Sequence, residues 1–216
     1  MTDEPKELAY IISLDKAKLG RDFYLRDCVT VAKDLIGKIL VKEYDGGHVS
    51  GIIVETEAYA GLTDPASHSF KGNKEGRVKV HYETGGLAYI YLIYGMYNCL
   101  NIVCNDAGIP ESVLIRALQP LEGVSAMHSR QGSEDERQLC NGPGKLCRSM
   151  GIDMNDYGAD LCCSSLYLLD APAPAETEIV CGPRIHIEYS GEEAKNHPWR
   201  FTLRDNEYVS GARIKR

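Results

Sequence analysis

Two glutamates and a tyrosine alternate along an apolar segment that ends at Tyr59. Alternate side chains of an extended strand share a face, so we expect Glu55, Glu57 and Tyr59 on one side. Ile53 should share that side. Glutamates on a strand most often form a solvated surface. We favour a catalytic role, because the strand leads into a loop that carries His68, and a carboxylate beside a cleft can act as a general base.

Tyrosines are concentrated in residues 89–101, where four of the thirteen in the chain fall within nine positions. Aromatic residues of this kind are common in the core of a sheet. Tyr94 and Met96, however, fall at a predicted hairpin turn, where a bulky outward group can act as a wedge in a stack of bases. Tyr91 and Tyr59 could hold a base between their rings. The pattern indicates an aromatic base-binding slot beside an exposed hairpin tip.

Hydrophobic periodicity predicts the elements that position these residues. Apolar residues at helical spacing over 29–36 predict a helix that Gly37 ends, and further helices are expected over 121–130 and 144–150. A long loop without periodicity is expected over 60–86. Strands are expected at 38–43, 48–59, 88–93, 97–104, 112–118, 161–170, 184–189 and 200–204. This order predicts a single α+β domain over residues 1–216 with a mostly antiparallel sheet and peripheral ends at 1–20 and 211–216.

Composition limits the class of protein. With 216 residues and 44% hydrophobic content, the chain can close one core. Its first residues lack the basic-then-apolar order of an export signal, so the cytosol, or the nucleus where the cell has one, is the expected location. The uncharged run 85–105 carries tyrosines and asparagines, which favour a hairpin over a membrane helix. We expect no membrane association.

Eight cysteines and a formal net charge of −7 exclude two simple interpretations. No C-x-x-C pair and no histidine at zinc-finger spacing is present, so free buried thiols are expected and no metal. The negative charge opposes unaided attraction to a polyanion. A nucleic-acid surface on this chain must therefore be a local basic patch.

Five motifs resemble the alkyladenine (3-methyladenine) DNA glycosylase family, in the family's order, between residues 23 and 210. They are Val-Glu-Thr-Glu-Ala-Tyr at 54–59, Ala-Ser-His-Ser at 66–69, Tyr-Ile-Tyr-Leu-Ile-Tyr-Gly-Met-Tyr-Asn-Cys-Leu-Asn at 89–101, Val-Leu-Ile-Arg-Ala-Leu-Gln-Pro-Leu-Glu-Gly at 113–123 and Leu-Cys-Asn-Gly-Pro-Gly-Lys-Leu-Cys at 139–147. The resemblance implies a compact domain around a curved antiparallel sheet, with a protruding hairpin that inserts into DNA.

The resemblance also implies roles for individual residues. Glu57 would deprotonate the water that attacks the sugar carbon, and Arg116 would hold the target nucleotide's backbone near that water. Asn101 would discriminate against guanine. The other implied roles are a pocket for the flipped base lined by Tyr59, His68 and Tyr91, an intercalating tip formed by Tyr94 with Met96 and Tyr97, and DNA backbone contacts from Arg77 and Lys145.

The implied activity is that of a monofunctional DNA glycosylase of base excision repair. The enzyme would flip damaged purines, such as 3-methyladenine, hypoxanthine or etheno-adenine, out of double-stranded DNA and leave an abasic site. A carboxylate can both take a proton and stabilise the positive charge that develops on the sugar, so no metal or redox cofactor is required. We expect the protein to act as a monomer.

The loop after His68 departs from the family pattern. The family commonly has Thr-x-Arg-Asn, whereas this chain has Glu-Gly-Arg-Val at 75–78. Arg77 is kept, but an acid and an apolar residue stand where backbone contacts would be expected, which bears on DNA affinity more than on catalysis. The loop's cations, Lys71, Lys74, Arg77 and Lys79, could form a DNA-binding patch or simply a solvated basic loop.

Two other classes of protein fit parts of the pattern. A non-catalytic protein that binds damaged DNA would use the tyrosine hairpin and the basic loop, but has no need of Glu57. A hydrolase of nucleosides or glycans would use Glu55 and Glu57 as a pair, yet same-face neighbours lie roughly 6–7 Å apart on one side of any substrate. Such a hydrolase has no use for an exposed Tyr94.

Overall fold

A computed structural model describes residues 17–211 of the chain. Its centre is an eight-stranded sheet in which every described pairing is antiparallel. The strand order is β3-β4-β5-β2-β1-β6, and β8 pairs with both β2 and β7. The strands are β1 (Ile39–Tyr44), β2 (Gly47–Tyr59), β3 (Ala88–Ile93), β4 (Tyr97–Cys104), β5 (Glu111–Glu122), β6 (Leu166–Leu169), β7 (Ile179–Gly182) and β8 (Arg200–Leu203).

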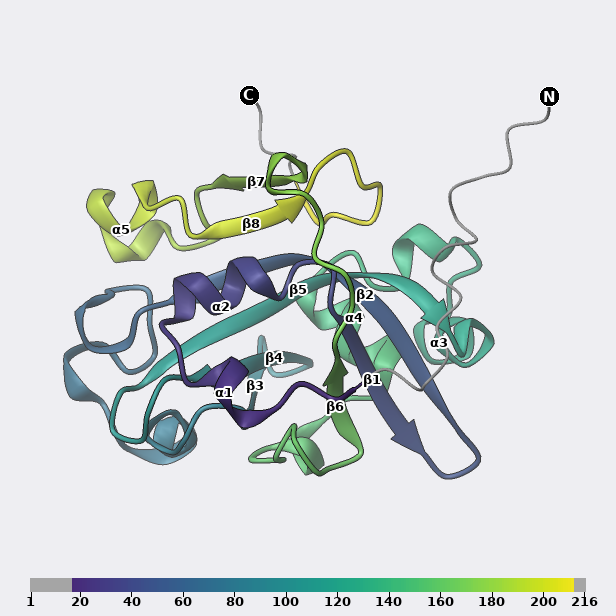
Figure 1. Cartoon of the computed structure of the whole chain (residues 1–216), viewed down its shortest axis with the longest axis horizontal. Coiled ribbons are helices and arrows are strands. Elements are labelled where there is room, and N and C mark those ends of the chain that lie inside the picture. The colour runs from purple at the N-terminus through teal and green to yellow at the C-terminus, as the bar shows by residue number, and fades with distance from the viewer. Residues whose placement is uncertain (1–16, 212–216) are drawn as a thin grey trace.

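Strand β2 is the centre of the sheet, because its thirteen residues are long enough to serve three partners. One edge pairs with β5 along most of its length. The first half of the other edge pairs with β1, and the second half, at Glu55 to Glu57, pairs with β8. The β7–β8 ribbon therefore pairs with the strand at the two glutamates, and Figure 1 shows it with α5 at one side of the molecule.

The pairing of β2 with β5 shifts register between Ile53 and Thr56. Such a bulge bends a strand and changes the direction of the side chains that follow. As a result Ile53 packs in the main core with Ala58, while Ile52 and Val54 belong to a second core cluster. The expectation that Ile53 shares a face with Glu55 and Glu57 is wrong, because simple alternation does not continue through the bulge.

Short helices cover the sheet. They are α1 (Arg21–Tyr24), α2 (Cys28–Asp34), α3 (Val124–Gln131), α4 (Pro143–Met150) and α5 (Glu192–Asn196). Helix α2 begins where the Asp27 side chain accepts a hydrogen bond from the backbone N–H of Thr30. It buries Val31 and Ala32 in the main core, and Gly37 follows it with a positive φ of 88°. The helix and the glycine that ends it were both predicted.

The sequence predicts the fold class correctly: the structure is a single α+β domain with a curled antiparallel sheet. The expected strands at 38–43, 48–59, 88–93, 97–104 and 200–204 are confirmed within a residue at each end. The run 85–105 contains β3 and β4, and within residues 17–211 no helix is long and apolar enough to cross a membrane. All eight cysteines are free, and five of them are buried.

Three expectations about secondary structure are wrong, and one further strand was not predicted. The helix expected from residue 121 begins at Val124, because β5 continues through Pro120 to Glu122 and the left-handed Gly123 then turns the chain. The strand expected over 161–170 is limited to β6, and β7 was not expected. No strand forms over 184–189, because Arg184 enters the core to pair with Asp64.

The segment 60–86 is ordered by short 3-10 helices at Gly61–Thr63, Phe70–Gly72 and Gly76–Tyr82. Near the start of the described chain, the backbone N–H of Leu19 donates to the carbonyl of Leu168, so this part lies along the outer edge of β6. Most of the two ends expected to be peripheral, 1–16 and 212–216, lies outside the described residues.

Candidate active site

Glu57 is buried where β2 pairs with β8, and both of its oxygens accept hydrogen bonds. Oε2 accepts from the hydroxyl of Tyr59 at 2.8 Å and from Nη1 of Arg116 at 3.3 Å. Oε1 accepts from the backbone N–H of Ile185 at 2.7 Å. Burial and the nearby Glu57 charge raise the pKa of Tyr59 well above its ordinary value, so this phenol stays protonated and donates. Three donors thus surround one carboxylate.

Glu55 holds Arg116 from the other side. Its Oε1 accepts from Nε of Arg116 at 2.9 Å and from Nε of Arg200 at 2.7 Å, and its Oε2 accepts from the backbone N–H of Ser210 at 2.7 Å. The Ser210 hydroxyl accepts from Nη2 of Arg116 at 3.3 Å. Two buried carboxylates and two buried guanidiniums therefore form one cluster, whose formal charges cancel.

An aromatic slot lies beside this cluster. Tyr59, Tyr91, His68 and Asn101 all line it, so the structure brings together the four residues expected to form a base pocket. The cavity measures about 40 Å³. Glu57 does not line the cavity itself but reaches it through the hydroxyl of Tyr59.

The ring of Tyr91 is positioned by its neighbours. It stacks on Tyr89 with centroids 5.3 Å apart, and His68 meets it edge-on at 4.7 Å. Nδ1 of His68 is 2.8 Å from the hydroxyl of Tyr89. Burial, with a smaller effect of Arg77, lowers the pKa of His68 to about 4. The imidazole is therefore neutral at physiological pH.

The hairpin of β3 and β4 ends in the exposed residues Tyr94, Met96 and Tyr97, which are 84%, 64% and 37% exposed. Tyr94 has a positive φ of 50°, a conformation that costs free energy for a residue with a large side chain. Helix α4 packs closely against the hairpin at Gly144. A Cβ at this position would lie only 3.0 Å from Cβ of Tyr97.

The two residues expected to contact the DNA backbone lie in different elements. The guanidinium of Arg77 lies 5.4 Å from the centroid of the Tyr91 ring, so this loop residue borders the slot. Lys145 is in the first turn of α4, and its ammonium donates to Oε1 of Gln138 and Oδ1 of Asn141. Arg148, one turn further along α4, lies over the Tyr97 ring.

A family model for methylpurine-DNA glycosylases matches residues 22–207 of this chain. The chain belongs to the methylpurine-DNA glycosylase family. Relatives provisionally named 3-methyladenine DNA glycosylases share 45% identity over 201 residues in Desulfitobacterium hafniense and 47% over 194 residues in Methanocella arvoryzae. The alignments cover 89% of this chain in both cases, and 98% and 95% of the relatives. The protein is accordingly a DNA repair enzyme that hydrolyses N-glycosyl bonds.

Several residues beside the glycosylase site were not predicted from the sequence. Arg184 and Asp64 form a fully buried ion pair, with contacts of 2.5 and 2.9 Å, and the guanidinium lies 4.8 Å from the Tyr59 ring centroid. Tyr189 lines the slot although it is 71% exposed, and its hydroxyl donates to the carbonyl of Ala66. In the sequence, Arg184 and Asp64 are single charged residues in separate loops. Their spacing gives no indication that they form a pair.

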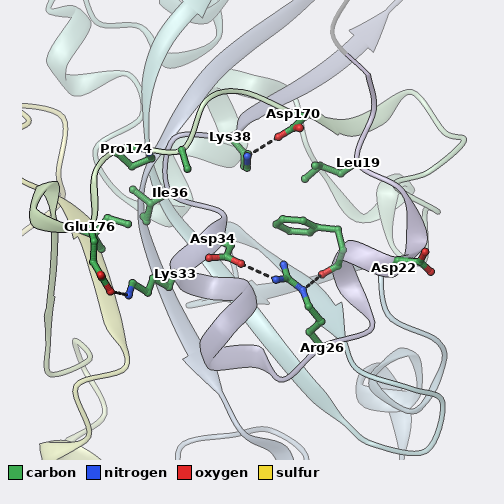
Figure 2. A pocket seen from close by; sticks show the side chains of 13 residues that line it. Leu19, Asp22, Arg26, Lys33, Asp34, Ile36, Lys38, Asp170, Pro174 and Glu176 are labelled. Atoms are coloured by element: carbon green, nitrogen blue, oxygen red, sulfur yellow. Dashed lines mark hydrogen bonds and ion pairs between the residues drawn. The ribbon is translucent and has the colours of Figure 1, made fainter.

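A larger hollow of the glycosylase, about 690 Å³, lies between α1, α2 and residues 170–179 (Figure 2). Its cations are paired with neighbouring acids. Lys33 donates to Glu176 at 2.6 Å, and Lys38 donates to Asp170 at 2.5 Å. Arg26 likewise donates to Asp34. Because these cations are already paired with acids, they are not free to bind an anionic ligand. The hollow is therefore not favoured as the functional site, although it is larger than the aromatic slot.

Proposed function

We propose that this glycosylase flips damaged purines out of double-stranded DNA, with 3-methyladenine the first candidate and hypoxanthine and etheno-adenine next. The observation that carries the proposal is the hydrogen bond between Glu57 and Tyr59, which joins a buried carboxylate to the aromatic slot. A purine between Tyr59 and Tyr91 would be recognised by stacking, and a cationic alkylated purine would gain from the electron-rich faces of both rings.

In the proposed reaction, Glu57 takes a proton from a water molecule as the water oxygen forms a bond to C1′ of the sugar. The bond from C1′ to the base nitrogen breaks, and its electron pair leaves with the base. A cationic alkylated purine becomes neutral in this step, so its departure needs no added proton. The carboxylate also stabilises the positive charge that develops on the sugar. Arg116 would hold the backbone of the target nucleotide near the water.

Base entry requires the slot to open, because about 40 Å³ is too small for a purine. The exposed Tyr189, tied at the rim by one hydrogen bond of 3.2 Å to Ala66, is the side chain best placed to move. Tyr94 would fill the space that the nucleotide leaves in the duplex, with support from Met96 and Tyr97. Arg77 and Lys145 would contact the DNA backbone on either side.

The test is a duplex with one 3-methyladenine analogue or hypoxanthine, treated with protein and then with alkali. We expect the wild type to produce an alkali-labile site. Glu57→Gln keeps the shape of the side chain but loses the base and replaces one accepting oxygen with an amide group that donates, so single-turnover release should fall by about 10²–10⁴-fold while DNA binding persists, and urea unfolding checks that the variant is folded. Glu122→Gln, at the partly exposed end of β5, is the matched control and should leave the rate unchanged. Equal release by the wild type and Glu57→Gln would refute the mechanism.

A further inference from the structure

His81 contributes an unpaired nitrogen to the slot. The residue lies in the 3-10 helix Gly76–Tyr82, is 1% exposed and lines the cavity. Its Nε2 has no hydrogen-bond partner among the described residues. A buried polar atom without a hydrogen-bond partner costs free energy. A bound ligand that supplies the missing hydrogen bond would remove this cost.

The other side of the imidazole is occupied. Nδ1 of His81 lies 2.7 Å from the hydroxyl of Ser69, which does not line the cavity. The ring meets Tyr89 edge-on, with centroids 4.2 Å apart. The edge that carries Nε2 is therefore the one left for the slot.

A second unpaired polar group lines the same cavity from a different strand. Nδ2 of Asn101, on β4, is buried and has no partner within the described part of the chain. Two orphan groups from separate elements at one small cavity indicate that a ligand with its own polar edge completes the hydrogen bonding. A flipped purine has such an edge.

We propose that His81 is a specificity-determining residue that exchanges a hydrogen bond with the edge of the base through Nε2. This inference rests on the proposed function. The Ser69 hydroxyl can donate or accept, so the pair has two states. When Ser69 donates to Nδ1, Nε2–H donates to an oxo group; when Nδ1–H donates to Ser69, Nε2 accepts from an amino group. The slot then accommodates both 6-oxo and 6-amino purines.

The charge state of the slot agrees with this assignment. Burial, with a smaller effect of His68, lowers the pKa of His81 to about 3. A neutral imidazole can present either a donor or an acceptor at Nε2, whereas an imidazolium can only donate. It also places no positive charge next to a cationic alkylated adenine.

The test compares His81→Gln with His81→Asn. The glutamine amide reaches the position of Nε2, whereas the asparagine amide reaches only the position of Nδ1 and keeps the contact with Ser69. A neutral 6-oxo base gains least from stacking on the tyrosines, so its release should depend most on Nε2. We expect His81→Asn to lower single-turnover release of hypoxanthine by about 10- to 100-fold, with a smaller effect on 3-methyladenine, and His81→Gln to restore most of the loss.

Each outcome is decisive. If His81 only braces the fold through Ser69, His81→Asn will match the wild type and His81→Gln will be impaired on both lesions, which overturns the inference while leaving the glycosylase intact. A wild type that releases 3-methyladenine but no hypoxanthine also overturns it. A wild type inactive on both lesions instead refutes the proposed function. Thermal melting of each variant identifies a loss of activity that comes from unfolding.

Discussion

At the scale of single residues, the site depends on Glu55 as much as on the proposed base Glu57. The two carboxylates lie on either side of Arg116 and differ in their surroundings. Glu57 is linked through Tyr59 to the slot, while Glu55 accepts hydrogen bonds from Arg116, Arg200 and Ser210. Glu55 is therefore a positioning residue, which keeps Arg116 in place and offsets its charge.

Replacing Glu55 with glutamine leaves Arg116 and Arg200 with one carboxylate between them. Because breaking a buried ion pair exposes an uncompensated charge, we expect the free energy of unfolding to fall by about 3–5 kcal/mol. Urea unfolding measures this loss. At a temperature where the variant remains folded, base release should also fall, and the loss should appear in the rate of the bound complex more than in DNA affinity. A variant as stable and active as the wild type would show that Arg116 needs no such support.

Residue types were predictable from the sequence, but their connections were not. The motifs placed Glu57, Tyr59, His68, Tyr91 and Asn101 in one site, and the structure brings them together. The bonds from Ile185 and Ser210 come from backbone N–H groups, which any residue type except proline could supply. No sequence pattern marks them, because contacts of this kind depend on how distant segments pack.

At the scale of elements, the β3–β4 hairpin is the part that we expect to enter DNA. Tyr94 contributes little to the core, since 84% of it is exposed. We expect Tyr94→Ala to leave stability within about 0.5 kcal/mol of the wild type. Loss of the stacking group should slow base release by about 10- to 100-fold, as judged from a stacking value of about 1–3 kcal/mol per base.

Stopped-flow fluorescence of a reporter base opposite or next to the lesion measures this step. Tyr44→Ala, at the end of β1 by another hairpin turn, is the control and should not change the kinetics. If Tyr94→Ala flips and releases the base as fast as the wild type, the hairpin tip is not a wedge.

Elements with a strong hydrophobic periodicity were predictable from the sequence. Elements whose bounds depend on tertiary contacts were not. Helix α2 and both hairpins follow their patterns closely. The extension of β5 past Pro120 was missed, because pairing with Gly51 in β2 outweighs the local signal for a turn. The segment 184–189 has a strand-like composition, but the ion pair of Arg184 with Asp64 holds it as an irregular chain.

At the scale of the whole molecule, two neutral histidines, His81 buried and His68 half-buried, make stability depend on pH. Burial lowers the pKa of His68 to about 4 and that of His81 to about 3, whereas both titrate near 6.5 when unfolded. As the pH falls below about 6.5, the unfolded chain takes up protons that the folded chain does not. Stability is therefore complete above that pH and declines towards pH 4 and 3, by at most about 1.4 kcal/mol per pH unit for each histidine.

Urea unfolding at pH 7, 6 and 5 checks this expectation. The decline should be about half as steep in His81→Gln, which removes one of the two groups. An unchanged slope in that variant would mean that His81 is not buried in its neutral form.

Strand β8 and Ser210 complete the cluster around Glu55 and Arg116, although they follow those residues by more than eighty positions. During synthesis on the ribosome, the aromatic slot and its acid are made long before the residues that hold them in place. A nascent chain that has emerged only as far as β6 thus lacks Ile185, Arg200 and Ser210, and it cannot cut a base from DNA until translation has passed them. The buried cluster is therefore completed late, by segments that follow β6 in the chain.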